Sequence, residues 1–366
     1  MIRPCIYLIL AAGLAGTIAC KKNSAHPVTP PADSTKASVY VLGTTGDSLV
    51  YWKDDTIVLL ATTAQVETYV NDISVAGGHV YVSGGSHTYN GRNEYGTPLL
   101  WSDGKMTQLP DASGVGTTGA VFANSTDVYV AGTVGTAQGT AAVVWKNGVA
   151  SIMPDTGTLA EYVNGIVVSG SDVYVSGGSP VLYQPASGPT YLAAYWKNGI
   201  IHSLDSGLIG ITPGGTAIAS APYTTGLSLS GSDVYVSGIE YGASTPSVFG
   251  ASQQAIYWKN GTPVLLPTTV DGTHGNAVLL ANDTVYVAGE VSYVGTFLAT
   301  IWKNGVLPTL PLSETNSGAN AIAVSGTDVY VAGEEYVNGA PFATYWKNGV
   351  ATHLGSGGTA YKIIVQ

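Results

Sequence analysis

The chain has 366 residues, of which only 10% are charged, and its formal net charge is −10. Nucleic-acid binding requires lysine and arginine clustered on one face. Only 13 such residues are present, and six of them are lysines that directly follow a repeated tryptophan. The composition therefore argues against a nucleic-acid-binding protein, while the length allows a large buried core.

An export signal is predicted at the start of the chain. Arg3 is followed by an apolar run over residues 6–19 that is too short to cross a bilayer comfortably. The run ends at Cys20 after small residues, an arrangement that resembles a bacterial lipobox, in which Cys20 would become the lipidated first residue. The alternative is an ordinary signal peptide with an incidental cysteine.

The segment after this signal predicts a tethered envelope protein. Residues 20–36 are rich in Pro, Ser, Thr and Lys, as in a flexible tether. With residues 1–19 removed, Cys20 is the only cysteine, so domain 37–366 must be held together by packing without a disulfide. We expect a cell-envelope location, with the lipid anchored in the outer membrane on its periplasmic or surface side.

Residues 37–366 consist of repeats. One unit has β-rich runs at residues 320–324, 329–333, 343–346 and 350–354, separated by turn signals such as Asn348-Gly349. We name these runs a to d. Seven units of about 47 residues predict an all-β fold, a seven-bladed β-propeller of four-stranded antiparallel blades. Each unit carries Val-Tyr-Val in strand b and one tryptophan in strand c, and the tryptophans are Trp52, Trp101, Trp145, Trp196, Trp258, Trp302 and Trp346.

The aromatic series predicts core packing between blades, because a stacked indole buries a large apolar area. A ladder of aromatic ligand contacts is the alternative. The ends of the chain predict how the ring closes. The first unit starts at strand b, near Val39, whereas residues 361–365 match strand a. We therefore expect the C-terminal strand to complete the first blade and remove an exposed edge.

The phrase Ala-Thr-Tyr-Trp-Lys-Asn-Gly-Val-Ala-Thr-His-Leu-Gly at residues 343–355 resembles the extracellular repeats of the HAF family. The chain is also loosely similar to kelch repeats through Val-Tyr-Val-Ser-Gly-Gly at residues 80–85 and 173–178. Its tryptophan, however, lies in strand c, which departs from kelch. The HAF resemblance covers about a dozen residues per unit. It implies an exported repeat protein and no particular ligand.

Length variation in the repeat predicts which face carries function. From each tryptophan to the next Val-Tyr-Val the distance is 27 or 28 residues in five of six cases, and 38 after Trp196. From the glycine after Val-Tyr-Val to the tryptophan it varies from 9 to 20. The b–c and d–a connections share one face of a propeller, which we call the loop face, and the short turns occupy the opposite turn face. Binding residues tend to lie on variable loops.

Three sets of loop-face residues are candidate ligand contacts. The long b–c loops carry polar and aromatic side chains suited to sugar or peptide: His87, Tyr89, Arg92, Tyr95, Tyr183 and Tyr191. Three consecutive units pair a glutamate with a tyrosine, which suits a cation or an amine: Glu240 with Tyr241, Glu290 with Tyr293, and Glu334 with Tyr336. Asparagines at the start of strand a would ring the channel mouth: Asn71, Asn164, Asn276 and Asn320.

Each set also has a structural alternative. The b–c loop residues could pack within their own loops, and the glutamates could be solvated surface charges. The asparagines could cap the d–a loops through side-chain hydrogen bonds. The aspartates that precede Val-Tyr-Val are interpreted as turn residues on the turn face: Asp127, Asp172, Asp233 and Asp328.

These patterns favour binding over catalysis. The sequence contains no sialidase Asp-box, no EF-hand calcium loop and no transition-metal motif, so no catalytic residue, metal or cofactor is assigned. We predict an exported, lipid-anchored, monomeric binding or scaffold module for a glycan, a peptide or an envelope protein. The alternative is a polysaccharide lyase or glycoside hydrolase that uses acidic residues of the same face. A purely structural envelope role is the third hypothesis.

Overall fold

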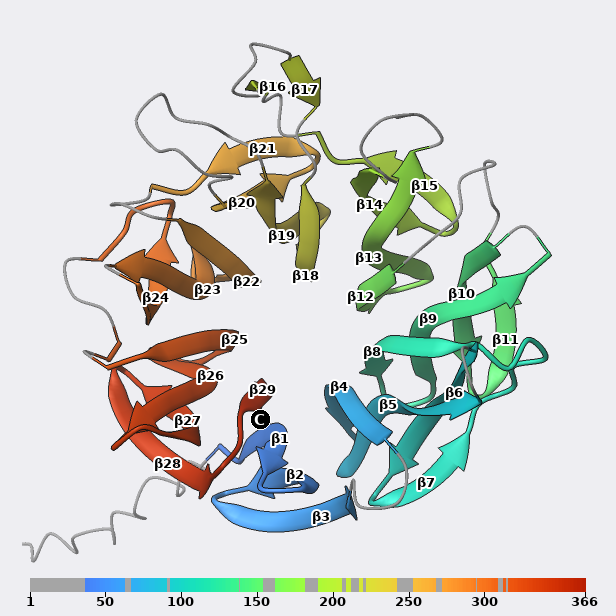
Figure 1. Ribbon diagram of the computed structural model, residues 1–366, viewed down its shortest axis with the longest axis horizontal. Coiled ribbons are helices and arrows are strands. Elements are labelled where there is room, and N and C mark those ends of the chain that lie inside the picture. Colours follow the sequence, from blue (N-terminus) through green and yellow to red (C-terminus); the bar gives the residue numbers. More distant parts are fainter. Residues whose placement is uncertain are drawn as a thin grey trace, which may run out of the picture. The chain divides into compact units, whose positions relative to one another are not determined.

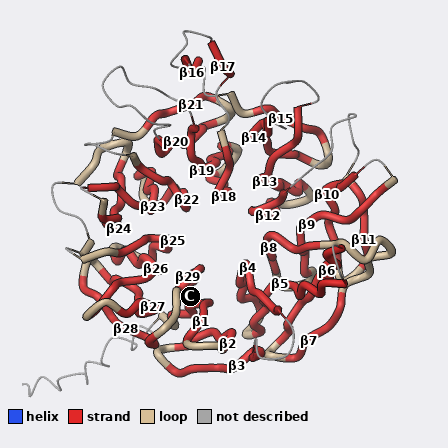
Figure 2. Tube along the Cα trace, viewed as in Figure 1, coloured by secondary structure: helices blue, strands red, loops and turns tan. Residues whose placement is uncertain are grey.

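The computed structural model describes residues 37–366 except for 63–66, 91–92, 138, 154–161, 182–189, 206–208, 212–216, 220–221, 242–252, 268–271, 294, 309–311 and 314. The predicted signal, Cys20 and the tether lie outside the described residues. Ala37–Gln366 form one compact unit. Within the described ranges every element is a strand, turn or loop, and none is a helix (Figure 2). Nor do these residues contain a helix long and apolar enough to cross a membrane.

Seven sheets are arranged in a ring, which confirms the predicted propeller (Figure 1). The inner strands a are β29 (Ala360–Val365), β4 (Glu67–Ala76), β8 (Thr117–Ala123), β12 (Tyr162–Ser169), β18 (Tyr223–Ser230), β22 (Thr273–Ala281) and β25 (Ser317–Ser325). In the same blade order, 1 to 7, strands b are β1 (Val39–Thr45), β5 (His79–Asn90), β9 (Val128–Thr136), β13 (Asp172–Val181), β19 (Asp233–Tyr241), β23 (Thr284–Tyr293) and β26 (Asp328–Val337).

The outer part of each blade follows the same order. Strands c are β2 (Ser48–Lys53), β6 (Asn93–Ser102), β10 (Gly139–Lys146), β14 (Thr190–Lys197), β20 (Gln253–Lys259), β24 (Thr296–Lys303) and β27 (Ala340–Lys347). Strands d are β3 (Thr56–Thr62), β7 (Lys105–Gln108), β11 (Val149–Ile152), β15 (Ile200–Ser203), β21 (Thr262–Leu265) and β28 (Val350–Ser356). Blade 6 has three strands among the described residues, followed by a single bridge between Lys303 and Val306. The long insertion after Trp196 holds a two-stranded sheet, β16 (Ile209–Ile211) with β17 (Ala217–Ala219).

The two ends of the propeller domain meet in blade 1. Strand β29 pairs with β1 in antiparallel register, with Val39 opposite Val365 and Val41 opposite Ile363. The predicted closure by the C-terminal strand is therefore confirmed. It gives β1 an inner partner that the N-terminal part of the domain does not supply.

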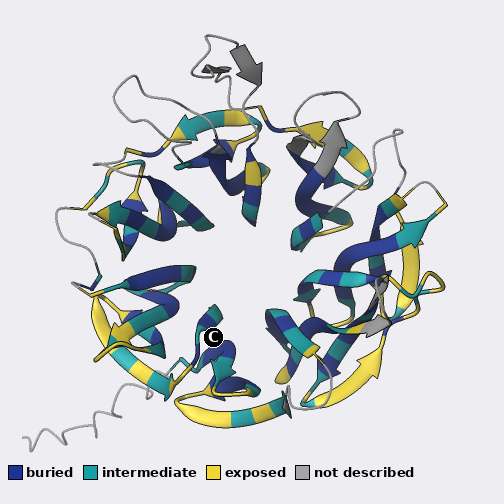
Figure 3. Cartoon of the chain, viewed as in Figure 1, coloured by how far each residue is buried: buried dark blue, intermediate teal, exposed yellow. Residues whose placement is uncertain are grey.

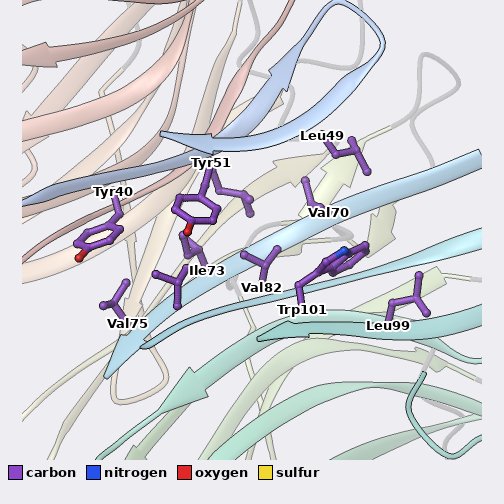
Figure 4. Packing of buried hydrophobic residues seen from close by; sticks show 11 residues of the cluster. Tyr40, Leu49, Tyr51, Val70, Ile73, Val75, Val82, Leu99 and Trp101 are labelled. Carbon is purple, nitrogen blue, oxygen red and sulfur yellow. The ribbon is translucent and has the colours of Figure 1, made fainter. Parts of the chain in front are cut away.

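The core lies between neighbouring blades. All seven tryptophans are at most 5% exposed. One cluster joins Tyr40 and Tyr51 of blade 1 to Val70, Val82 and Trp101 of blade 2 (Figure 4). Buried residues line the facing sides of the sheets, while exposed residues concentrate on the outer strands (Figure 3). The tryptophans thus pack blade against blade, as predicted.

On the turn face, the aspartate that precedes Val-Tyr-Val links strand b to the Lys-Asn-Gly segment at the end of strand c. In blade 3 the Asn147-Gly148 turn has positive φ at both residues, 51° and 79°, as a two-residue hairpin requires. Asn147 Nδ2 donates to Asp127 Oδ1 at 2.8 Å, and Asn147 Oδ1 accepts the Val128 N–H at 2.8 Å. Lys146 Nζ lies 3.1 Å from Asp127 Oδ2 and 5.2 Å from the ring centroid of Tyr129. The Asn147 and Lys146 contacts lower the pKa of Asp127.

This Asp–Asn–Lys link recurs in blades 4, 5 and 7 through Asp172, Asp233 and Asp328. The aspartates therefore link strand b to the end of strand c. Asp172, Asp233 and Asp328 are the first residues of their strands b, and Asp127 directly precedes β9. Blade 2 has other residues at these two positions. His79 stands at the position of the aspartate and Asp103 at that of the asparagine, and His79 Nδ1 lies 2.7 Å from Asp103 Oδ2. The interaction is kept although both residues differ.

A β-bulge at one equivalent position shapes every inner strand. The unpaired bulge residues are Asn71, Gly119, Asn164, Thr225, Asn276, Asn320 and Tyr361. Opposite each bulge lies the glycine that follows Val-Tyr-Val. A Cβ atom on Gly177 would lie 2.2 Å from the Tyr162 carbonyl oxygen and 3.2 Å from Trp196 Cζ3. The repeated glycine is therefore required by the approach of two backbones beside an indole ring.

Gly177→Ala is expected to destabilise the domain, because the added methyl has no space between strand a and the tryptophan. Overpacking of this kind costs roughly 1–3 kcal/mol. Urea unfolding followed by tryptophan fluorescence would measure it. Gly46→Asn is the matched control, since Gly46 has φ 51° and a Cβ atom there would meet no other atom within 4 Å, and Asn tolerates that backbone region. Equal stability of the two variants would contradict the steric explanation.

Removal of residues 360–366 should lower the thermal midpoint by roughly 10 °C or more, because two isoleucines and a valine of β29 leave the blade 1 sheet. Differential scanning calorimetry measures the shift. A synthetic peptide of residues 359–366 added in excess should recover part of the lost stability, because it can pair with β1. An unchanged midpoint would show that closure contributes nothing.

Candidate functional site

The bulge asparagines hold neighbouring blades together at the central channel. Asn276 Nδ2 donates to the Ala319 carbonyl of the next blade at 3.0 Å, and Asn320 Nδ2 donates to Ala360 O at 3.1 Å. Asn71 and Asn164 make the same bond to Thr118 and Thr224. The four amides lie on strand a as expected. Each amide donates an N–H to the adjacent inner strand, which links neighbouring blades, and Asn320 also donates to Glu334 Oε2. Asn71 and Asn164 line the cavity described next, and a role of the four asparagines in binding a ligand stays a prediction.

The residue two positions before each bulge lies at the loop-face end of strand a. In blades 2 to 5 this position holds Tyr69, Thr117, Tyr162 and Tyr223, and all four line one cavity of about 450 Å³. His87 of strand b and Lys362 of β29 also line it. Because its walls come from five blades, the cavity lies at the mouth of the central channel. We call Tyr69, His87, Tyr162 and Tyr223 the aromatic bowl.

The rings of the aromatic bowl are stacked in two pairs. The centroids of Tyr69 and His87 are 4.8 Å apart with planes at 21°, and those of Tyr162 and Tyr223 are 4.1 Å apart with planes at 19°. Tyr162 Oη accepts the Thr224 N–H at 3.1 Å, which fixes that ring against blade 5. Tyr223 remains 38% exposed. Two rigid aromatic surfaces are thus held at the channel mouth with part of their area open to solvent.

Carboxylates occupy the other side of the mouth. In blades 6 and 7 the position two before the bulge holds His274 and Gly318. His274 Nδ1 lies 2.6 Å from Glu290 Oε1, and its Nε2 contacts Gln253. A Cβ atom on Gly318 would lie 2.8 Å from Glu334 Oε1 and 3.2 Å from Glu290 Oε2. The absence of a side chain at Gly318 therefore lets two acids of neighbouring blades approach each other. We call Glu290 and Glu334 the carboxylate pair.

Burial raises the pKa of Glu334, and the charge of Glu290 raises it further. A hydrogen bond from Asn320 Nδ2 to Glu334 Oε2, 3.1 Å long, opposes this in part. The adjacent Glu335 behaves in the opposite way. Burial alone would raise the pKa of Glu335, but hydrogen bonds from Ser313 and His353 outweigh it and the pKa is lowered. His353 Nε2 lies 2.6 Å from Glu335 Oε2.

The predicted acidic arc is thus only partly present. Glu290 and Glu334 come together, but Glu240 is fully buried and lies opposite Gln254 in the strand register. Its side chain is therefore not exposed to solvent as the predicted arc required. Tyr293 and Tyr336 are 55% and 36% exposed on strands that rise above the pair. The side chains of Tyr89, Arg92, Tyr95, Tyr183, Tyr191 and Tyr241 lie outside the described part of the chain.

Chemically, the mouth combines aromatic faces on one side with hydrogen-bonding acids on the other. Across the described ranges no cluster of three or more His, Cys, Asp or Glu side chains could hold a metal ion. Tyr69, Tyr162 and Tyr223 were not predicted from the sequence, because the aromatic candidates were placed in the loops that follow strand b. The signal was present in the repeated Tyr-Val-Asn at residues 69–71 and 162–164. Only a bulge in strand a explains why that position turns toward the channel.

The opposite pKa shifts of the two adjacent glutamates predict opposite pH effects. Because its folded pKa is raised, Glu334 favours folding when protonated, and this stabilisation is lost as pH rises from 4.5 through the folded pKa. Relative to wild type, Glu334→Gln should therefore gain thermal stability as pH rises from 4 to 8.

Glu335→Gln is the matched control with the opposite sign. The lowered pKa of Glu335 adds stability above pH 4.5 that is lost as pH falls through the folded pKa. This variant should lose thermal stability relative to wild type as pH rises. Thermal melts of the three proteins across that range decide the matter, and parallel profiles for both variants would refute the assignment.

Comparison with known proteins supports no family assignment. No protein family matches the chain, and no curated protein matches it. The resemblance to HAF and kelch repeats therefore stays a prediction. Similar solved structures include the tricorn protease, with a TM-score of 0.48 and 9% identity over 91% of this chain and 36% of that one.

In two further similar structures the matched region makes up a larger share of the other chain. The β-propeller domain of the Trilobed protease from Pyrococcus furiosus has a TM-score of 0.39 and 11% identity, over 78% of this chain and 95% of its own. TolB from Acinetobacter baumannii has a TM-score of 0.37 and 10% identity, over 77% of this chain and 65% of its own. Similarity at this level says nothing about a ligand of this chain.

Proposed function

We propose that this protein is a carbohydrate-binding module whose site is the aromatic bowl. The observation that carries the proposal is the cavity of about 450 Å³ walled by two stacked aromatic pairs at the channel mouth. A volume of this size is typical of a small-ligand site.

The chemistry of the walls supports a sugar. A pyranose ring has an apolar face of C–H groups and a rim of hydroxyl groups. Tyrosine rings cover the apolar face and offer a hydroxyl at the same time. Thr117 and Lys362 add polar groups to the same cavity. Because Tyr162 is fixed by its bond to Thr224, little side-chain entropy would be lost when the ligand binds.

Binding is preferred to glycoside hydrolysis because the two acids do not line the proposed site. Glu290 contacts His274 and Glu334 accepts a hydrogen bond from Asn320. Neither glutamate is among the residues that line the cavity of the aromatic bowl. The function we propose is therefore capture without turnover. We further propose that the domain is exported and held at the cell envelope through Cys20, as the lipobox-like sequence predicts.

Tyr223→Ala should weaken binding by about tenfold or more, because it removes the most exposed wall of the bowl and the stacking partner of Tyr162. One aromatic stacking surface contributes roughly 1–3 kcal/mol in comparable stacking sites. The probes are cello-, xylo-, malto- and chito-hexaose, and isothermal titration calorimetry measures their affinities. Tyr293→Ala is the control, since Tyr293 is more exposed and lies outside the bowl. Binding by none of the four probes, or equal loss in both variants, would overturn the proposal.

A further inference from the structure

Blade 6 departs from the repeat at three positions that meet in one place. The first is strand d. In blade 3, Lys146 pairs with Val149 and Val144 with Ser151. In blade 6, Lys303 and Val306 exchange both backbone bonds, at 3.1 and 2.9 Å. Hydrogen-bonded pairs recur at every second residue, so the next pair would join Ile301 to residue 308.

Residue 308 is proline, which has no N–H to donate. Strand d therefore stops after the Lys303–Val306 bridge. The outward-facing N–H and C=O of Ile301 have no backbone partner among the described residues. Among the described residues of blade 6, no strand d continues beyond this bridge.

The second departure concerns the indole of the next blade. Trp145 Nε1 donates to the carbonyl of Pro110 at 2.8 Å, and Trp258 Nε1 to that of Asp205 at 2.9 Å. Trp302 Nε1 donates to Pro267 O at 3.2 Å. Each acceptor directly follows the leucine that closes the preceding blade. Trp346 is fully buried, yet its Nε1–H has no acceptor within the described ranges. A buried donor without an acceptor destabilises the fold.

The third departure leaves a lysine without its acid. Lysines at this position in blades 3, 4, 5 and 7 each form an ion pair with the aspartate before Val-Tyr-Val. In blade 6 that aspartate is replaced by Thr284. Lys303 Nζ still lies over the Tyr286 ring, at 5.6 Å, but no carboxylate of the described residues pairs with it.

These three groups line a single cavity of about 420 Å³ between blades 6 and 7. Ile301, Pro308, Leu312, Val331 and Trp346 form its apolar part, and Lys303 provides a cation. The cavity includes the a–b and c–d turns of blade 7, so it opens on the turn face, opposite the aromatic bowl. Its volume lies within the range of small-molecule sites.

We propose that this cavity binds a small carboxylic acid with an apolar body, such as an aryl- or alkyl-carboxylate. The apolar body fills the apolar part of the cavity. The carboxylate pairs with Lys303, and the apolar body packs against the side chain of Trp346, which lines the cavity. The site would be independent of the aromatic bowl, because it lies on the other face and uses other blades.

The proposal is tested with the full chain carrying 15N-labelled tryptophan indoles, and with 4-phenylbutyrate as the probe. The Trp346 indole N–H resonance should shift in a saturable manner. The Trp101 resonance is an internal control, because that indole is also unpaired but does not line the cavity. The Trp346 resonance is assigned from Trp346→Phe or, if that variant does not fold, by triple-resonance experiments.

Matched variants test the role of charge. Lys303→Gln should weaken binding of 4-phenylbutyrate roughly threefold to fivefold, as expected for a partly exposed ion pair. Lys146→Gln, the same change in blade 3, should leave it unchanged. Thr284→Asp restores the acid found in four other blades and should also weaken the carboxylate, but not 4-phenylbutanol. A Trp346 resonance that does not move, or equal affinity for acid and alcohol in wild type, would overturn the proposal.

Discussion

The contact on which the ring depends is the one between the bulge of strand a, the glycine after Val-Tyr-Val and the tryptophan of strand c. The bulge brings a backbone carbonyl into the space where a Cβ atom of the glycine would stand, and the indole closes it from the side. Because the contact involves two backbones, no other residue fits at the glycine. The indole also packs against the neighbouring blade and so buries this contact. The backbone approach recurs in every blade, because a Cβ atom on each of the seven equivalent glycines would lie within 2.3 Å of a backbone oxygen.

The same bulge organises the functional face. It places the residues before it around the channel mouth, where Tyr162 of blade 4 stacks on Tyr223 of blade 5. In blades 2 to 5 those residues are tyrosine or threonine and form largely aromatic walls, whereas in blades 6 and 7 histidine and glycine admit the carboxylate pair. The scaffold is thus uniform, and the chemistry of the mouth changes from one side to the other through single residues per blade.

Departures from a repeat are informative because the repeat supplies an internal reference. The exchange of His79 and Asp103 preserves an interaction, so it indicates structure. Thr284 and Pro308 each remove an interaction without replacing it, and the groups they leave unpaired line one cavity. A single lost interaction would indicate only neutral variation of the repeat sequence. Two losses beside one cavity are the reason for proposing a ligand there.

The sequence by itself determined the number of blades, the position of each tryptophan, the Asn-Gly turns and the closure by the C-terminal strand. These follow from local periodicity and turn chemistry, which are written within single units. Tertiary structure alone decided that Glu240 is enclosed while Glu290 and Glu334 meet, and that the asparagines bind the next blade. It also decided that Tyr69, Tyr162 and Tyr223 converge. Such contacts join residues 40 to 60 positions apart across blade interfaces. Their geometry depends on the bulge, which shifts the register by one residue.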